Sequence, residues 1–369
     1  MAIIGGGIAG LALAAELAEL DGRLVERSGG ARPQSRIVLL ERENQFAYHT
    51  TGRSIAAFAE SLGSPQTRAV TRASRTILDA LGAESGAPLL RTRPVVWVAD
   101  EEHLDRLNRL LTGNPALRAV DPAAARTLCP VLRESAAARA AVERTAQDVD
   151  VDALQRQYRD RATAAGAVLR TAIGLEAGTR EPDGWRLATD RGELRAGRVV
   201  NAAGPWADAV AGRLGAAPAG LTNLRRTVAI VSAESISPAW PLVMDVGEGF
   251  YFRPEHGGLL VSPADETPSP PTDAVAVPRD VGLAVERATT ATTLHPQRVR
   301  TSWAGLRTFA PDRDPIVGPD PRHEGLYWFA ALGGTGIQTA PALARLAAAQ
   351  LLDEPYEIPG LRLEALLPR

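Results

Sequence analysis

A glycine-rich turn near the start of the chain constrains the fold more than any other feature. Residues 5–10 read Gly-Gly-Gly-Ile-Ala-Gly. The turn follows a short apolar run at residues 2–4 and precedes residues 11–20, where apolar side chains recur at helical spacing. This order predicts a strand, a tight turn and a helix, which is how a βαβ unit begins. A second apolar run, Ile37–Leu40, predicts the next strand of that unit.

The glycines of this turn fit the pattern G-x-G-x-x-G, which binds dinucleotides when it lies between a strand and a helix. Gly5 allows the tight turn, Gly7 allows a pyrophosphate to approach the backbone, and Gly10 allows the helix to pack closely against the strand. The N–H groups at the start of the helix, around Ile8 and Ala9, favour a bound phosphate. The turn is therefore predicted to hold a dinucleotide.

The second strand of such a unit ends in an acidic residue that binds the ribose hydroxyls. Two residues qualify, Glu26 and Glu41. We prefer Glu41, with Arg42 beside it, because Ile37–Leu40 is the better strand. Residues 22–36 are then predicted to form an inserted loop between the helix and the second strand.

Composition excludes several classes of enzyme. All 41 basic residues are arginine, so no lysine can form a Schiff base with pyridoxal phosphate or serve a Walker P-loop. One cysteine, Cys129, and five histidines without a metal-binding motif argue against a disulfide framework, an iron–sulfur cluster or a metal site. A formal net charge of −2 gives no electrostatic footprint for nucleic acid.

The hydropathy pattern bears on location. No uninterrupted apolar segment reaches the ~18 residues expected of a transmembrane helix. The N-terminus leads directly into the glycine turn and lacks the basic and apolar regions of an export signal. We therefore expect a cytoplasmic protein without a transmembrane segment.

The remaining elements suggest two domains. Apolar periodicity predicts helices at residues 68–81, 101–111, 152–165 and 337–352, and strands at residues 94–98, 199–204, 227–231, 249–253 and 326–331. Strands of parallel type lie near the start, the middle and the end of the chain, and those between them look antiparallel. This order predicts an α/β nucleotide-binding domain into which an antiparallel-sheet domain is inserted in two pieces. The boundaries assign residues 1–85, 146–215 and 303–369 to the first domain and residues 86–145 and 216–302 to the second.

Two loops are distinctive. Residues 47–54, Ala-Tyr-His-Thr-Thr-Gly-Arg-Ser, combine small and hydroxyl side chains ahead of a predicted helix. Such a loop suits the phosphate and the ring edge of a flavin, although His49 is equally well read as a capping or packing residue. Residues 263–278 contain five prolines and are predicted to form a loop without regular structure.

Five segments together resemble the D-amino-acid oxidase (DAO) family of FAD enzymes, and within it the chain is most similar to bacterial D-arginine dehydrogenase. The segments are residues 5–10, residues 47–54, Val199–Trp206, Thr301–Phe309 and Gly333–Gln338. They follow one another in the family's order over nearly the whole chain. The resemblance implies a Rossmann-type (glutathione-reductase-like) FAD domain with an inserted antiparallel-sheet substrate domain.

The resemblance also implies where non-covalent FAD is held. The glycine turn and Glu41 hold its adenosine half, and residues 49–54 line the flavin. The last helix meets the pyrimidine end, where its N-terminus can stabilise negative charge on the reduced ring. The residues implied to bind the cofactor are Gly5, Gly7, Ile8, Ala9, Gly10, Glu41, Arg42, His49, Thr51, Gly52, Arg53, Ser54, Ala203, Gly204, Gly333, Gly336 and Ile337.

On the substrate side, the resemblance places Arg226, Tyr251 and Arg307 at the substrate carboxylate, with Gly334 and Gln338 beside the flavin. The chemistry of these residues agrees, because an arginine fork binds a planar carboxylate through two hydrogen bonds and a tyrosine hydroxyl adds one directional bond. The alternatives are surface ion pairs for the two arginines and a core position for Tyr251.

Departures from D-arginine dehydrogenase define the expected specificity. Val95 stands where that enzyme carries an acidic residue for a cationic side chain. Ala57, Ala59 and Leu62 stand where it carries His, Thr and Tyr. A pocket lined by Ala57, Leu62 and Val95 would desolvate a cationic side chain without offering a partner. D-arginine and D-lysine are therefore expected to be poor substrates.

The implied reaction is FAD-dependent oxidation of the Cα–N bond of a D-amino acid with a non-basic side chain, by hydride transfer to flavin N5. The imino acid then hydrolyses to a 2-oxo acid and ammonia. Three alternatives remain open: a substrate that is an N-methyl or cyclic secondary amino acid, a 2-hydroxy-acid substrate, and an FAD-binding module without turnover. Because the chain has no lysine for oxygen activation, a dehydrogenase is favoured over an oxidase, with the electron acceptor undefined.

Overall fold

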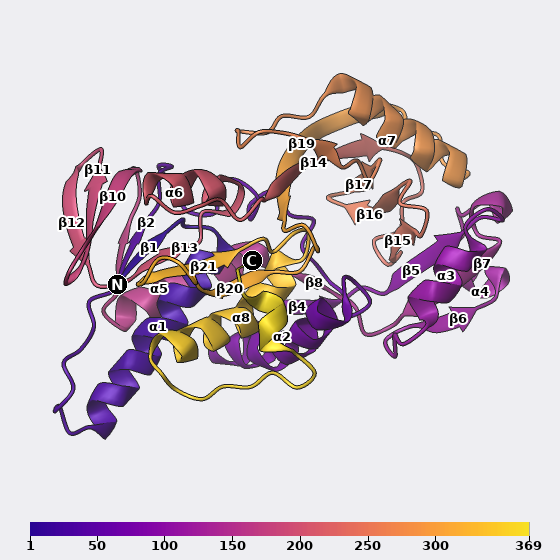
Figure 1. Ribbon diagram of the computed structural model, residues 1–369. Helices are drawn as coiled ribbons and strands as arrows, with labels where there is room; N and C mark the ends of the chain where they lie inside the picture. The colour runs from indigo at the N-terminus through magenta and orange to yellow at the C-terminus, as the bar shows by residue number, and fades with distance from the viewer. Residues whose placement is uncertain (369) are drawn as a thin grey trace.

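A six-stranded sheet forms the core of the part that contains both termini (Figure 1). The computed structural model describes residues 1–368. The strand order is β20-β21-β13-β1-β2-β9, and β1 pairs in parallel with both β13 and β2. The strands are β1 (Ala2–Ile4), β2 (Val38–Leu40), β9 (Val168–Arg170), β13 (Val199–Asn201), β20 (Ile316–Pro319) and β21 (Leu326–Ala330).

Helices cover one face of this sheet and a smaller sheet covers the other. Side chains alternate along β1, so that Ile3 packs under the helices while Ala2 and Ile4 pack on the opposite face. The helical layer consists of α1 (Ile8–Arg27), α2 (Pro65–Glu84), α5 (Val151–Ala164) and α8 (Gly336–Leu351). The opposite layer consists of β10 (Leu175–Glu181), β11 (Gly184–Thr189), β12 (Gly192–Ala196) and α6 (Ala207–Arg213).

The predicted loop at residues 22–36 is wrong at its start, because α1 continues through Gly22 to Arg27. Leu24 is buried in the core beneath the helix, and this contact extends the helical periodicity beyond Leu20. Glu26 lies on the exposed side of α1 and so cannot end a strand. The choice of Glu41 as the residue after the second strand is confirmed.

A nine-stranded sheet forms the other part of the molecule. Its order is β18-β14-β17-β16-β15-β5-β7-β6, and β19 pairs with the free side of β14. The sheet is antiparallel as predicted except that β15 and β5 run in parallel, with Leu242 opposite Val95. The strands are β5 (Val95–Ala99), β6 (Arg118–Val120), β7 (Arg139–Glu143), β14 (Thr222–Ser232), β15 (Leu242–Asp245), β16 (Tyr251–Glu255), β17 (Gly258–Ser262), β18 (Thr267–Pro268) and β19 (Arg298–Phe309).

The helices around this sheet, and a short bridging sheet, complete the fold. They are α3 (Leu104–Leu111), α4 (Pro122–Leu128) and α7 (Pro278–Ala291), with β3 (Ala57–Phe58), β4 (Leu90–Thr92) and β8 (Gln147–Val149) in the bridging sheet. Figure 1 shows α7 over β14 and β17, and α3 and α4 beside β5 and β7. Short 3₁₀ turns occur at Glu134–Ala136, Gly204–Trp206 and Leu363–Leu366.

The longest antiparallel pair, β14 with β19, runs from α7 toward the six-stranded sheet (Figure 1). The predicted domain boundary at residue 303 falls inside β19, opposite Val228 of β14. The two-domain division therefore stays a prediction, with this ribbon shared between the parts. Residues 263–277 are irregular apart from β18, as predicted for a proline-rich loop, whereas Pro278 begins α7.

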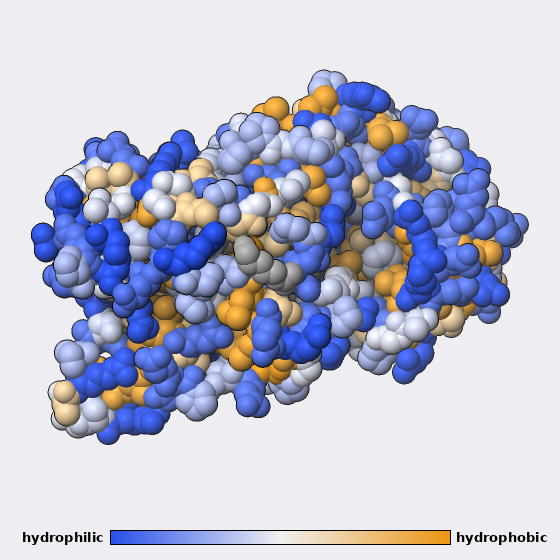
Figure 2. Space-filling model, in the orientation of Figure 1, coloured by the Kyte–Doolittle hydropathy of each residue, from blue (hydrophilic) through white to orange (hydrophobic). Residues whose placement is uncertain are grey.

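Hydrophilic residues dominate the surface seen in Figure 2, with hydrophobic residues in separate patches. Within residues 1–368, every helix is too short or too polar to cross a bilayer.

Replacing Gly10 by alanine tests the contact on which the first βαβ unit depends. A Cβ at Gly10 would lie 1.9 Å from the backbone oxygen of Gly5, so the helix cannot stay where it is. We expect Gly10→Ala to lower the free energy of unfolding by at least about 3 kcal/mol, measured by urea denaturation.

Gly22→Ala in the same helix is the matched control. No atom lies within 4 Å of a Cβ placed at Gly22, so alanine should raise the free energy of unfolding by up to about 1 kcal/mol. Equal stabilities for the two variants would contradict the steric argument.

Candidate active site

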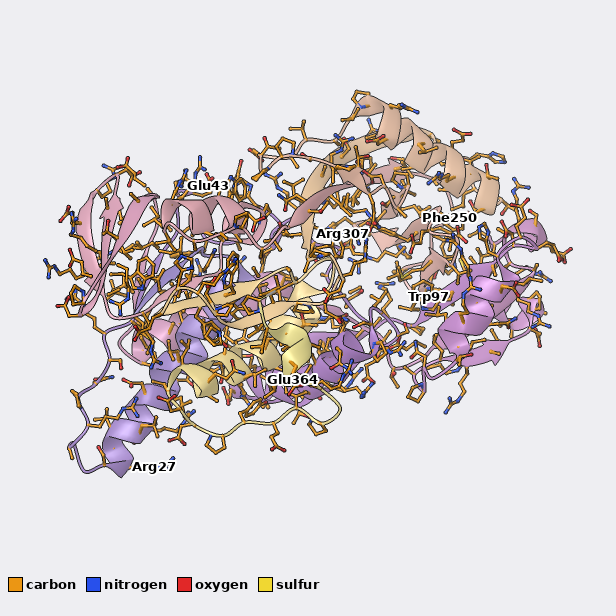
Figure 3. The ribbon with its side chains drawn as sticks, viewed as in Figure 1. Arg27, Glu43, Trp97, Phe250, Arg307 and Glu364 are labelled. Atoms are coloured by element: carbon orange, nitrogen blue, oxygen red, sulfur yellow. The ribbon has the colours of Figure 1, made fainter. Side chains whose placement is uncertain are left out.

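A large cavity, of about 910 Å³, lies between the two sheets. Its walls come from the glycine turn, the loop at residues 41–54, the start of α8, and strands β5, β14, β15, β16 and β19. Figure 3 shows Arg307 between the two parts, with Glu43 on the side of the six-stranded sheet and Trp97 and Phe250 on the far side. The volume and the elongated lining are appropriate for a large cofactor together with a small ligand.

The glycine turn presents backbone N–H groups to one end of the cavity. Gly7 caps α1 without a side-chain hydrogen bond, and the first turn of α1 contains no acidic residue. The Ile8 N–H donates to Thr51 Oγ1 at 3.0 Å, which fixes the loop at residues 41–54 against the helix start. The positive end of the helix dipole, together with the N–H groups of the first turn that Thr51 does not bind, suits an anionic group such as a pyrophosphate. Ala9 lines the cavity here, whereas Gly10 lies behind the turn.

Glu41 lies directly after β2 and holds the turn. Its Oε2 accepts from the Gly6 N–H at 2.7 Å, and its Oε1 accepts from the Glu43 N–H at 2.8 Å. A carboxylate has about four lone-pair positions, so further hydrogen bonds from ribose hydroxyls are possible. Arg42 also lines the cavity and lies 6.0 Å from the centroid of the Trp206 ring.

His49 contributes a buried nitrogen that is available to a ligand. Its Nε2 is 3.0 Å from Glu43 Oε1, and its ring centroid is 4.5 Å from that of Trp206. Its Nδ1 is buried and has no hydrogen-bond partner, although Asp273 Oδ1 lies at 4.0 Å. Buried polar atoms are rarely left unpaired, so this nitrogen supports a bound group at this point.

The next residues of the loop are held by their own contacts. The guanidinium of Arg53 donates to the carbonyls of Ala274 and Ala304 and pairs with Asp273. Arg53 and Ser54 line the cavity, but Gly52 does not. A Cβ at Gly52 would lie 2.6 Å from the Ala47 oxygen, so glycine there serves the packing of the loop.

The other helix start at the cavity belongs to α8. Thr335 caps it without a side-chain hydrogen bond to the helix N–H groups, and its first turn lacks acidic residues. The predicted cofactor residues around it all line the cavity, as does Gly334 of the predicted substrate set: Ala203, Gly204, Gly333, Gly336 and Ile337. Two helix dipoles therefore point their positive ends at one cavity.

Arg226 and Arg307, here called the guanidinium pair, lie on the same face of the β14–β19 ribbon. Arg226 is opposite Gly305 and Arg307 is opposite Leu224, so the two arginines are diagonal neighbours. A Cβ at Gly334 would lie 2.6 Å from Arg307 Nη1, so glycine at this position lets Arg307 reach the start of α8.

Tyr251 lies beside this pair. Its ring centroid is 5.7 Å from Arg226 Cζ, and the residue is buried but lines the cavity. Burial, together with the positive charge of Arg226, lowers the pKa of Arg307 to about 10. Arg307 is therefore still charged near neutral pH, in a place where its charge favours an anionic ligand.

Glu266 was not predicted, and it bonds to the guanidinium pair. Its Oε1 accepts from Arg307 Nη2 at 2.5 Å and lies 3.5 Å from Arg226 Nη2. Arg313 donates through both Nη atoms to this carboxylate, at 2.8 and 3.1 Å. Burial alone raises the pKa of Glu266, but the hydrogen bond from Arg313 and the charges of Arg307 and Arg226 outweigh burial and hold the pKa below its ordinary value.

Three predicted pocket residues fall in different places. Ala57 and Leu62 line the cavity. Val95 does not, because it is 1% exposed within β5, on the face that carries Trp97, and packs into the core there. Ala59 is also buried and outside the lining. The interpretation of Val95 as a pocket residue is therefore wrong, although Trp97, two residues along, does line the cavity.

Gln338 was placed beside the ligand, but the structure directs it elsewhere. Its Oε1 accepts from the Ala59 N–H at 3.0 Å, and its Nε2 donates to the Ala59 oxygen and to Thr71 Oγ1. Gln338 is 1% exposed and does not line the cavity. Its amide instead fixes the strand β3 region against α2 and α8.

Sequence reasoning also missed much of the apolar wall on the side of the nine-stranded sheet. Alternation along the strands could have indicated these residues, but the strand order could not be predicted. They are Trp97, Val228, Leu242, Met244, Val246 and Phe250.

The donor set fits FAD rather than a metal. The lining combines two helix starts, a glycine cradle and an unpaired buried imidazole nitrogen. Among residues 1–368, no cluster of His, Cys, Asp and Glu could hold a metal ion. Cys129 is fully buried outside the cavity, and burial raises the pKa of its thiol to about 12, so it is unsuited to a covalent flavin link.

Comparison with known families extends over most of the chain. The family model described as FAD dependent oxidoreductase (DAO) matches residues 1–350. Mitochondrial dimethylglycine dehydrogenase from Rattus norvegicus is 26% identical over 218 residues, which are 52% of this chain and 25% of that protein. Glycine oxidase from Pseudomonas aeruginosa is 28% identical over 169 residues, 44% of this chain and 43% of that protein. The chain thus spans less than half the length of these curated relatives.

Solved structures share the fold over the whole chain. Glycine oxidase from Geobacillus kaustophilus has a TM-score of 0.82 and 23% identity, covering 100% of this chain and 97% of its own. L-proline dehydrogenase from P. horikoshii has a TM-score of 0.82 and 20% identity, covering 100% and 98%.

A carboxylate at position 95 tests the placement of Val95. Val95 lies opposite Glu143, which is buried and accepts from the N–H groups of Glu60 and Ser61. Because a second carboxylate would be buried beside Glu143, we expect Val95→Glu to cost at least about 3 kcal/mol of unfolding free energy without creating activity toward D-arginine. Val95→Thr, nearly the same in shape, should cost only about 1–2 kcal/mol. A stable Glu variant that oxidises D-arginine would restore Val95 to the pocket.

Removing the amide of Gln338 tests whether that residue is structural. Gln338→Leu leaves the N–H and oxygen of Ala59 without their partner, so we expect a loss of about 2–4 kcal/mol in urea denaturation. The folded fraction should keep its KM for substrate. The exposed Gln34→Leu should change stability by less than about 0.5 kcal/mol. An altered KM at unchanged stability would instead place Gln338 at the substrate.

Proposed function

Because the chain belongs to the DAO family of FAD-dependent oxidoreductases, we propose that it oxidises the Cα–N bond of a D-amino acid with a non-basic side chain. The products are an imino acid, which water hydrolyses to a 2-oxo acid and ammonia, and the two-electron-reduced cofactor. The amino-acid class is supported by the guanidinium pair in the cavity. The D configuration rests on the resemblance of the sequence motifs to D-amino-acid oxidases.

The single observation that carries this proposal is the position of Arg307. It lines the cavity next to Gly334, at the start of α8, where the pyrimidine end of the flavin is expected. Arg226 lies diagonally across the ribbon on the same face. A carboxylate bound by both side chains would have its α-carbon held beside the cofactor site.

The cofactor and the residues of the cavity would have separate roles in the reaction. FAD, when bound, would supply the two-electron redox chemistry for the hydride that leaves the α-carbon. The glycine turn, Glu41 and the starts of α1 and α8 hold the cofactor's phosphates, ribose and pyrimidine edge. The guanidinium pair and the Tyr251 hydroxyl orient the substrate through its carboxylate. The α-carbon of the substrate is then held at a fixed distance from the cofactor site, which lowers the entropic part of the barrier.

The remaining lining explains why a non-basic side chain is proposed. Ala57, Leu62, Leu242, Met244 and Phe250 give that side of the cavity an apolar wall. Asp245 also lines the cavity, but both of its oxygens accept from the N–H groups of the turn at Gly247 and Gly249. A cationic side chain would have to compete for this carboxylate while losing its hydration.

An N-substituted glycine or a cyclic secondary amino acid is the second candidate substrate. It is favoured by the match of half of this chain to dimethylglycine dehydrogenase and by the shared fold with L-proline dehydrogenase and an iminodiacetate oxidase. The same guanidinium pair would bind the carboxylate of such a substrate.

Anaerobic bleaching of the flavin absorbance separates the candidates. The purified holoenzyme is mixed with D-amino acids, N-methyl and cyclic amino acids, and 2-hydroxy acids in turn. Bleaching by non-basic D-amino acids supports the proposal, and bleaching by secondary amines alone supports the second candidate. A flavin spectrum that none of these compounds bleaches identifies a binding module. Oxygen consumption then distinguishes an oxidase from a dehydrogenase.

Arg307→Ala tests the guanidinium pair directly. Removing a buried charge that binds the substrate carboxylate should lower kcat/KM by roughly 100-fold or more, while the flavin absorbance shows that FAD stays bound. Arg300→Ala is the control on the same strand, because Arg300 is exposed and donates to the His256 carbonyl, away from the cavity lining. Unchanged kinetics in the Arg307 variant would remove Arg307 from the site.

A further inference from the structure

We propose that Glu266 competes with the substrate carboxylate for the guanidinium pair and thereby sets the affinity of the site for carboxylates. This inference rests on the proposed function, since it takes Arg226 and Arg307 as the carboxylate-binding groups. Glu266 is the acceptor on Arg307 Nη2, the same kind of donor that a substrate carboxylate would need. The substrate would displace the Glu266 side chain and leave it bound to Arg313.

The three arginines around Glu266 differ in solvent exposure. Arg226 and Arg307 have side chains that are 14% and 21% exposed, whereas the side chain of Arg313 is 54% exposed. Arg313 Cζ lies 3.9 Å from the centroid of the Phe309 ring, which supports it at the edge of the cavity. Glu266 thus has an outer partner at the solvent side and inner partners inside the cavity.

The backbone beside Glu266 is held by its neighbours, whereas the Glu266 side chain is held through its carboxylate. The carboxylate of Asp265 accepts from the N–H and hydroxyl of Thr227, and the Asp265 carbonyl accepts from Arg226 Nε. Beyond Glu266, Thr267 and Pro268 are exposed in the short strand β18. A movement of the Glu266 side chain alone, about its own torsions, is therefore sufficient to release Arg307.

Arg307 retains a donor that Glu266 does not use. Arg307 Nε is buried and has no hydrogen-bond partner, whereas Nη2 is bound by Glu266. A substrate carboxylate could accept from both Nε and Nη2 in the bidentate geometry that arginine favours. Bound in this way, the ligand would give Arg307 one more hydrogen bond than Glu266 does.

The charges of Glu266 and its three arginines also favour replacement of Glu266 by a ligand carboxylate. Three guanidinium groups surround one carboxylate, so the cluster keeps a net positive charge whether Glu266 or a ligand occupies the inner position. Without Glu266, the guanidinium groups would repel one another across a partly buried space. Glu266 therefore also holds the arginines together.

The test is the affinity of the holoenzyme for benzoate, a carboxylate without an amine, measured by calorimetry and by the perturbation of the flavin spectrum. We expect Glu266→Gln to bind benzoate roughly tenfold more tightly than the wild type, because glutamine keeps the shape but loses the competing charge. Glu134→Gln removes the same charge from a side chain that is 84% exposed and outside the cavity, and should leave the affinity unchanged. Arg307→Ala should weaken benzoate binding in both backgrounds.

The alternatives give different results. Equal or weaker benzoate binding by Glu266→Gln, with Arg307-dependent binding by the wild type, overturns this inference alone. Weaker binding of glycine with unchanged binding of benzoate shows that Glu266 holds the substrate amine, and also overturns it. Failure of wild type and variant alike to bind benzoate overturns both this inference and the proposed function. If Glu266→Gln does not fold, Glu266→Asp, with its shorter reach, should show the same change at smaller size.

Discussion

The structure depends on one close contact, between the start of α1 and the end of β1. Only glycine fits at position 10, because a Cβ there would overlap the Gly5 oxygen. This approach brings the first helix turn over the sheet edge and lets Thr51 and Glu41 bond to the backbone of residues 6–8. The loop at residues 41–54, and with it the cofactor end of the cavity, is positioned by that contact.

The proposed substrate end of the cavity, around the guanidinium pair, is formed by different elements. Its charged groups lie on a long antiparallel ribbon, and its apolar groups come from strands β5, β15 and β16 of the nine-stranded sheet. Burial of two guanidinium groups is costly unless carboxylates accompany them, and Glu266 meets that need within the chain. Under the proposed function, the same requirement that stabilises the folded cluster would favour carboxylates as ligands.

Much of the fold was predictable because local patterns encode it. The glycine turn, the strand at Ile37–Leu40 and the choice of Glu41 over Glu26 follow from periodicity and turn chemistry. The helix end at Arg27 was misjudged because Leu24 gains its burial from tertiary packing that a linear pattern does not contain. The parallel pairing of β15 with β5 joins segments far apart in the sequence, and no local signal specifies it.

The site was predictable to the extent that residue type determines chemistry. Arg226, Tyr251 and Arg307 all reach the cavity, since few roles other than anion binding suit an inward-facing arginine. Val95 and Gln338 were misplaced because their neighbours, Glu143 and Ala59, become visible only in three dimensions. Glu266 lies in a proline-rich loop without periodicity, so nothing in the sequence distinguishes it from the other acidic residues.

The β14–β19 ribbon has a mechanical consequence. Arg226 and Arg307 are spaced by the hydrogen-bond register of two adjacent strands, in which Arg226 faces Gly305 and Leu224 faces Arg307. Their separation does not depend on the angle between the two large sheets. A hinge movement that opened or narrowed the cavity would move both guanidinium groups together. The distance between the two groups that would bind a carboxylate would therefore be the same in every conformation of the molecule.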